Sequence, residues 1–278
     1  MNVVFPGVIP KDLPSVTAKG RFLIPTPPIV RSLRPLHPPY LIGRFDKIVK
    51  AGVEKSLVAA WQNLMKLDVQ FPKPDPSRSK TPALHLGIWE LYSANPRVTE
   101  DSRNQSNQVI KAMDRFLRIL NASISPKIFN ILQSHYRLQL DRQLLWVSII
   151  FSTSRFFYSK SRAYNRVMKI LAKELANRPA LQFGGAFFTV AAKEGSSEII
   201  HLDFNDDPNG VSWVVPLGDW EGGEFCLPQL GIKIPIQSGQ ILGAMTRILA
   251  HCSAPVTKGF RIVLTLFADK NLLKHATE

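Results

Sequence analysis

Apolar residues recur at helical spacing through the first part of the chain. Between residues 46 and 69 one helix face is apolar, formed by Val49, Val53, Leu57, Trp61 and Leu64. The same period predicts further helices over residues 104–121, 126–138 and 161–177. Before these helices, residues 1–45 are rich in proline and basic residues. Because proline fixes φ and removes a hydrogen-bond donor, we expect an extended basic arm there.

From about residue 183 the pattern changes to short β-rich runs separated by Gly, Pro, Asn and Asp. Strands are predicted near residues 185–192, 198–204, 211–217, 223–228, 231–235, 240–246, 248–253 and 260–268. This number and spacing of strands is typical of a double-sheet jelly roll. The predicted fold class is therefore α+β, with a jelly-roll core in residues 181–278 and a helical support region in residues 46–180 packed outside it. Residues 46–278 are expected to form one structural domain.

The charge of the chain adds a candidate partner. The net charge is +14 and the pI about 10.0, which favours a polyanion such as nucleic acid, although a basic protein without such a partner is the alternative. On the polar side of the helix predicted over residues 161–177, four basic residues fall in line: Arg162, Arg166, Lys169 and Lys173. We expect these residues to contact phosphates, and an ordinary solvated helix face is the alternative.

One predicted strand carries two side chains that bind metals. Strand side chains alternate, so His201 and Asp203 point to one face of the strand over residues 198–204. His251, in the strand over residues 248–253, supplies a second imidazole. Two imidazoles and one carboxylate form the triad that occupies one face of an octahedral Fe(II). The three remaining positions would accept a bidentate 2-oxo acid and O₂.

An arginine on the last predicted strand completes this pattern. Arg261 follows His251 by ten residues and is the only charged residue within an otherwise apolar strand. Its planar guanidinium matches a carboxylate in a bidentate way. Alternation places Arg261, Val263 and Thr265 on one face, and Thr265 adds a hydroxyl to it. Each residue alone is a weak signal, since a lone His or Asp near a strand is usually a satisfied structural residue. The combination indicates a metal and 2-oxo-acid site.

With these residues assembled, residues 185–268 resemble the 2-oxoglutarate/Fe(II) dioxygenases of the double-stranded β-helix fold. Within that superfamily the sequence is most similar to the fungal branch of the Tet/J-binding-protein DNA-base oxygenases. The matching residues are His201-Leu202-Asp203, Gly218 through Phe225, Pro228 through Gly231, Pro235, Gly239-Gln240, and His251 through Arg261 to Phe267.

The resemblance implies a catalytic centre in which His201, Asp203 and His251 hold Fe(II). It also implies that Arg261 binds the co-substrate 2-oxoglutarate, whose oxidative decarboxylation to succinate and CO₂ supplies the oxidant. Family members that act on DNA extrude the target base.

In some members of this family a polar group soon after the His-x-Asp touches the edge of the extruded base. In this sequence Asn205 and Asp206 occupy that stretch, and we expect them to bind substrate. A turn-stabilising role for Asp206 is the alternative.

Together these observations predict a dioxygenase that oxidises a methylated nucleobase, 5-methylcytosine-like or N-methylated, in DNA more than in RNA. Apolar runs stay shorter than the roughly 18 residues that span a bilayer, so no membrane partner is expected. We expect an intracellular, nuclear monomer. Two other functions stay open: the same iron chemistry on a small molecule or peptide, and a nucleic-acid-binding protein without catalysis.

Overall fold

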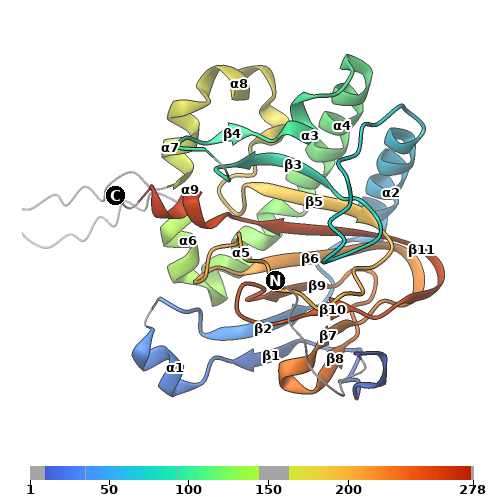
Figure 1. Ribbon diagram of the computed structural model, residues 1–278, viewed down its shortest axis with the longest axis vertical. Helices are drawn as coiled ribbons and strands as arrows, with labels where there is room; N and C mark the ends of the chain where they lie inside the picture. Colours follow the sequence, from blue (N-terminus) through green and yellow to red (C-terminus); the bar gives the residue numbers. More distant parts are fainter. Residues whose placement is uncertain (1–9, 35, 92, 144–162, 277–278) are drawn as a thin grey trace, which may run out of the picture.

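A large antiparallel sheet forms the frame of the protein (Figure 1). The computed structural model describes residues 10–34, 36–91, 93–143 and 163–276. Along the sheet the strands follow the order β1-β2-β9-β6-β11-β5-β3-β4. Their bounds are β1 Phe22–Pro25, β2 Tyr40–Phe45, β3 Leu84–Trp89, β4 Arg97–Val98, β5 Thr189–Glu194, β6 Ser212–Gly222, β9 Ile241–Ala244 and β11 Val256–Phe267.

A smaller sheet lies against one end of the large one. It has the order β10-β7-β8, with β7 at Phe225–Leu227, β8 at Ile232–Ile234 and β10 at Cys252–Ser253. Apolar side chains from both sheets meet in one buried cluster that includes Val214, Leu242, Phe225, Leu227 and Ile234. Two antiparallel sheets packed on a shared apolar layer form the predicted jelly-roll core.

Helices cover the other face of the large sheet. The bounds are α1 Pro28–Leu33, α2 Ala51–Met65, α3 Glu100–Arg103, α4 Asn107–Ser123, α5 Ser125–His135, α6 Arg137–Gln143, α7 Ala163–Ile170, α8 Ala172–Asn177 and α9 Lys270–Lys274. The apolar faces predicted for α2 and α4 are buried in the main core, with Trp61 and Phe116 rings 5.8 Å apart. The predicted arrangement of helices outside a jelly roll is therefore confirmed. Within the parts of the chain described, no helix is long and apolar enough to cross a membrane.

Side chains along β11 point alternately to the two faces of the large sheet. Ile262, Leu264 and Leu266 are fully buried on the helix side. The alternate residues face the space between the two sheets, and this set comprises Arg261, Val263 and Thr265. Neighbouring β5 follows the same rule, since Val190 and Ala192 join the helix-side core. The inward face of the large sheet thereby becomes one wall of the site described below.

Four strands come from the part of the chain predicted to be an arm and helices. β1 and β2 extend the sheet beside β9, while β3 and β4 extend it beyond β5. These strands give weak sequence signals for local reasons. Proline ends β1 with a shift in register, and β2 carries Arg44, which is fully buried and donates to the backbone oxygens of Pro235 and Gly20 at 2.8 and 3.0 Å. Residues 1–9 of the predicted arm lie outside the described residues.

The helix predicted over residues 161–177 is two helices. α7 ends at Ile170, α8 begins at Ala172, and Leu171 between them departs from helical geometry at φ −104° and ψ 23°. Arg166 of α7 makes a bidentate ion pair with Glu90, which follows β3; its Nη2 lies 2.7 Å from Oε1. Glu90 has no solvent exposure and also contacts His275 Nδ1 at 2.8 Å. This ion pair therefore fastens α7 to the edge of the sheet.

Replacing Arg166 with alanine should lower the free energy of unfolding by about 3 kcal/mol, because it leaves a buried carboxylate without its main cationic partner. Lys169→Ala, an exposed position in the same helix, is the matched control and should change it by less than about 0.5 kcal/mol. Urea denaturation of both variants measures the difference. Equal, small effects would contradict a structural role for the Arg166–Glu90 pair.

Candidate functional site

His201 and His251 face each other across a backbone bridge. The His201 N–H donates to His251 O, and the His251 N–H donates to His201 O, both at 3.0 Å. Close by, the Ser253 N–H donates to Ser197 O at 2.7 Å, so residues 197–201 run beside β10. The strand predicted over residues 198–204 is thus reduced to this short pairing, which nevertheless brings the two imidazoles together with ring centroids 4.4 Å apart.

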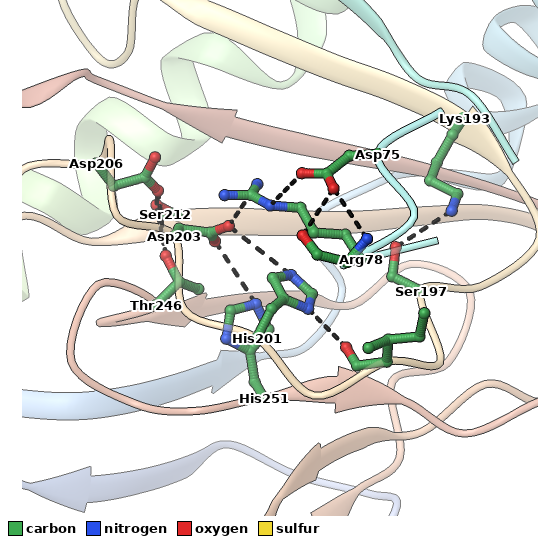
Figure 2. Close-up of polar contacts among 12 residues, drawn as sticks. Asp75, Arg78, Lys193, Ser197, His201, Asp203, Asp206, Ser212, Thr246 and His251 are labelled. Carbon is green, nitrogen blue, oxygen red and sulfur yellow. Dashed lines mark hydrogen bonds and ion pairs between the residues drawn. The ribbon is translucent and has the colours of Figure 1, made fainter. Parts of the chain in front are cut away.

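Asp203 completes a cluster of three metal-binding side chains (Figure 2). Its own N–H donates to Thr246 O at 3.1 Å, which fixes the backbone at this point. His201 Nε2 lies 3.8 Å from Asp203 Oδ1, and His251 Nε2 lies 3.5 Å from Oδ2. One ligand atom from each residue falls within 4.8 Å of the others, and the cluster is buried. The predicted alternation of His201 and Asp203 onto one face is borne out by this convergence.

Both imidazoles are oriented by backbone carbonyls. His201 Nδ1 lies 2.7 Å from Ile199 O, and His251 Nδ1 lies 2.9 Å from Leu249 O. Nδ1 must therefore carry the proton that is donated, and each Nε2 presents a lone pair toward Asp203. A ring N–H bound to a carbonyl is the usual support of a metal-binding histidine. Phe225 stacks on the His251 ring at 5.1 Å and holds its plane.

The protonation states also suit metal binding. Burial, together with the nearby His251, lowers the pKa of His201 to about 4, so this imidazole is neutral at pH 7. Burial alone would raise the pKa of Asp203, but His251, His201 and Arg78 lie close and lower it. A neutral imidazole and an ionised carboxylate are the ligand forms that a divalent transition metal requires. The donor set fits Fe(II).

These three residues open onto a cavity of about 530 Å³ between the two sheets. The inward side chains of the large sheet form its floor, in the order Val214, Thr265, Ala191 and His85 across β6, β11, β5 and β3. His85 and Trp89 add an aromatic wall, with rings 5.3 Å apart. Thr265, which the sequence placed on the face of Arg261, is among the lining residues.

Arg261 is buried on this inward face at one end of the floor. Only 2% of the residue is exposed, and its Nε has no hydrogen-bond partner among the described residues. In the described part of the chain, the guanidinium makes one hydrogen bond, a long one from Nη1 to Gly195 O at 3.5 Å. A buried guanidinium with free donors calls for an anionic ligand. Its orientation agrees with the predicted role in binding a carboxylate.

Gly223 leaves space for the Arg261 guanidinium, and Trp220 contacts it. Gly223 has a φ of +68°, and a Cβ at this position would lie 3.0 Å from Arg261 Nη1. The guanidinium carbon lies 5.7 Å from the centre of the Trp220 ring, at cation–π distance. Burial lowers the pKa of Arg261 to about 10, partly offset by Glu224, so the side chain stays charged at pH 7.

Sequence reasoning missed Arg78, which contacts the metal-binding cluster from a distant loop. Its Nη1 donates to Asp203 Oδ1 at 3.0 Å, and its Nε lies 3.6 Å from Asp75 Oδ2 (Figure 2). Asp75 is itself held in a turn by the Ser77 N–H at 2.9 Å. The loop is polar and proline-rich, so no local pattern indicates that it reaches the site.

Asn205 and Asp206, the predicted substrate residues, both line the cavity. Asp206 is buried and accepts hydrogen bonds from Ser212 Oγ and, at 3.1 Å, from Thr246 Oγ1. Burial and the nearby Asp203 raise its pKa well above the usual range, which favours the neutral acid. These contacts agree with the structural alternative for Asp206, while contact with substrate stays a prediction for both residues.

The four basic residues predicted to contact phosphates are only partly exposed to solvent. Lys169 and Lys173 are exposed, whereas Arg166 is engaged by Glu90 as described above. Arg162 lies outside the described residues. Nucleic-acid contact at this surface therefore stays a prediction for all four residues, and Arg166 would have to leave Glu90 to contact a phosphate.

The chain matches no family model and no curated protein by sequence. Among solved structures it is similar to NgTET1 in complex with 5mC DNA, with a TM-score of 0.49, 15% identity, and coverage of 84% of this chain and 73% of that chain. It is also similar to the viral collagen prolyl hydroxylase vCPH from Paramecium Bursaria Chlorella virus-1 (TM-score 0.38, 13% identity, 82% and 94% covered). A third similar structure is a Pseudomonas putida prolyl-4-hydroxylase, with a TM-score of 0.38, 13% identity, and coverage of 82% of this chain and 91% of that chain. Likeness at this level leaves the function to be argued from this chain's own site.

Binding of a divalent metal to the triad should raise the melting temperature. A metal ion at 100 times its Kd adds about 2.7 kcal/mol of stability, or about 5–10 °C for a domain of this size. Differential scanning fluorimetry of the EDTA-treated protein with added Mn²⁺ measures the shift. Asp203→Asn should remove most of it, and an unchanged shift in this variant would exclude the triad as the binding site.

Without metal, part of the stability should be sensitive to acid through His201. Its folded-state pKa of about 4 lies below the ordinary 6.5, so the unfolded state binds more protons between these values. The stability contribution is present above pH 6.5 and is lost as the pH falls toward 4. In EDTA, His201→Asn should show a shallower decline in unfolding free energy from pH 6.5 to 4.5 than the wild type. Parallel declines would contradict this assignment.

Proposed function

We propose that this chain is an iron(II)- and 2-oxoglutarate-dependent dioxygenase. His201, Asp203 and His251 hold the metal, and Arg261 holds the distal carboxylate of the co-substrate. One observation carries the proposal. An oriented His-Asp-His donor set lines a cavity together with Val263 and Thr265 of β11, and the same inward face of β11 carries buried Arg261, whose Nε has no hydrogen-bond partner among the described residues. The metal requires the first feature, and a dicarboxylate co-substrate requires the second.

The bound iron, with O₂ and 2-oxoglutarate, supplies the oxidant, and the protein supplies positioning. Overall, 2-oxoglutarate, O₂ and a substrate C–H give succinate, CO₂ and a C–OH. Ile199 O and Leu249 O keep the two imidazoles turned with Nε2 inward. Arg78 holds one Asp203 oxygen through a charged hydrogen bond, and this limits rotation of the carboxylate.

The proposed substrate is a methylated nucleobase, 5-methylcytosine-like or N-methylated, in DNA more than in RNA. Support comes from the net charge of +14, from the exposed cations Lys169 and Lys173, and from the resemblance of residues 185–268 to the Tet/J-binding-protein oxygenases. An extruded base stacks on aromatic rings and bonds along its edge, and the cavity offers His85 and Trp89 beside Asn205 for these contacts. A monomeric, nuclear protein fits this substrate and stays a prediction.

A second candidate is the same chemistry on a small molecule or a peptide. The observation that favours it is the Arg166–Glu90 ion pair, which withdraws one of four expected phosphate contacts. A nucleic-acid-binding protein without catalysis would not require an oriented donor set next to a buried arginine.

Turnover tests the proposal directly. Wild-type protein with Fe(II), O₂ and 2-oxoglutarate should release succinate when given duplex DNA that contains 5-methylcytosine or N6-methyladenine. Mass spectrometry of the digested DNA should find the corresponding hydroxylated nucleoside. Asp203→Asn should reduce both signals by more than about 100-fold, since loss of even an outer partner of a metal ligand costs 10–100-fold.

Different outcomes separate the candidates. Succinate release that does not rise with either methylated DNA, but rises with a small molecule or a peptide, would move the substrate to that class. Absence of succinate under every condition, with a protein that is folded and loaded with iron, would overturn the proposed dioxygenase.

A further inference from the structure

Lys193 is a second buried cation in the cavity wall. It lies in β5 opposite Val263 of β11, two residues along from Arg261, and on the same inward face. The side chain lines the cavity, and only 8% of the residue is exposed. Sequence reasoning missed it, because one lysine near the end of a short strand is usually solvated.

The contacts of Lys193 are with neutral oxygens. Its Nζ donates to Ser79 Oγ, to Ser196 O at 2.8 Å and to Ser197 Oγ at 3.2 Å (Figure 2 shows the contact with Ser197). Among the described residues it forms no ion pair with a carboxylate. A buried ammonium held only by neutral groups keeps a large part of its desolvation cost.

Fully buried Arg44 is held by backbone oxygens, but three partly buried arginines elsewhere in the fold are balanced by carboxylates. Each pairs with a carboxylate on another element, in the pairs Arg142 with Asp207, Arg166 with Glu90, and Arg178 with Asp114. Lys193 and Arg261 lack such a partner and lie close enough to repel each other. Burial and the charge of Arg261 lower the pKa of Lys193 to about 8, and Glu198 in the following loop partly offsets this. An anion between the two cations would relieve both penalties.

We infer that Lys193 and Arg261 together form the site for the distal carboxylate of 2-oxoglutarate. This inference rests on the proposed function and extends it, since Lys193 becomes a positioning residue for the co-substrate. The guanidinium supplies a planar pair of donors. The ammonium, whose three N–H groups bond Ser79, Ser196 and Ser197, supplies a second positive charge beside them. Lys193 also reaches Ser79, the neighbour of Arg78, so the same residue links the carboxylate site to the loop that contacts Asp203.

Isothermal titration calorimetry of the metal-loaded, full-length protein under anaerobic conditions tests this role. Two ligands are compared: 2-oxoglutarate, which has the distal carboxylate, and oxalate, which chelates the metal but lacks that group. Lys193→Met should weaken 2-oxoglutarate binding by about 10- to 100-fold, as expected for the loss of a buried positive charge near the carboxylate, with oxalate binding unchanged. Lys193→Arg should retain most of the affinity.

Lys258→Met is the matched control. Lys258 lies in β11, and its side chain is 75% exposed and pairs with Glu221. We expect wild-type affinity for both ligands. A second measurement is the number of protons taken up when 2-oxoglutarate binds. An anion raises the pKa of Lys193 above 8, so at pH 8.5 binding of 2-oxoglutarate should take up a fraction of a proton, measured from binding enthalpies in buffers of different ionisation enthalpy. Lys193→Met should abolish this uptake.

Three results would overturn the inference. They are unchanged 2-oxoglutarate affinity in Lys193→Met, equal loss of 2-oxoglutarate and oxalate affinity, and proton uptake that persists without Lys193. Equal loss for both ligands would mark a structural role for Lys193 in holding the loop at Ser79. In each of these cases the proposed dioxygenase stands, provided that Arg261→Met still loses 2-oxoglutarate. Failure of the metal-loaded wild type to bind 2-oxoglutarate would instead remove the proposed function as well.

Discussion

The reciprocal backbone hydrogen bonds between His201 and His251 are the constraint on which the site depends. Two N–H···O bonds of 3.0 Å join segments that are far apart in the sequence. Because the partners lie directly opposite, both imidazoles project to the same side, and alternation then adds Asp203 to them. The carbonyls two residues before each histidine fix the rings in turn. Rigid backbone, and not flexible side-chain reach, therefore defines the positions of the three donors.

A second feature of the structure is that some buried cations have carboxylate partners and others do not. Partly buried Arg166 is neutralised by Glu90, and fully buried Arg44 is held by backbone oxygens. Among the described residues, Arg261 and Lys193 form no ion pair with a carboxylate, while the carboxylate of Asp203 is turned toward the imidazoles and Arg78. The inward face thus carries a cluster of metal ligands and, on β5 and β11, two cations suited to an anion. Such preorganisation costs folding stability and is typical of binding sites.

The sequence was sufficient where chemistry follows strand periodicity. The facing of His201 with Asp203, and the inward direction of Arg261, both follow from period-two alternation within a jelly roll. It was insufficient where contacts are long-range. Arg78 reaches Asp203 from a turn-rich loop, and Lys193 acquires its meaning only from the neighbouring strand. The strands β1 and β2, at one end of the sheet, were missed because Arg44 and the prolines around them are typical of an exposed arm. In α7, helical periodicity placed Arg166 on the polar side but could not reveal its partner Glu90.

The most direct test of the account is a crystal structure of the protein with Fe(II) and N-oxalylglycine, an unreactive analogue of 2-oxoglutarate, prepared without oxygen. Anomalous scattering at the iron edge locates the metal independently of any model. We predict one iron about 2.1 Å from the Nε2 atoms of His201 and His251 and from an oxygen of Asp203, with the distal carboxylate of the analogue on Arg261. Iron bound elsewhere, or an analogue whose distal carboxylate points away from Arg261, would contradict it.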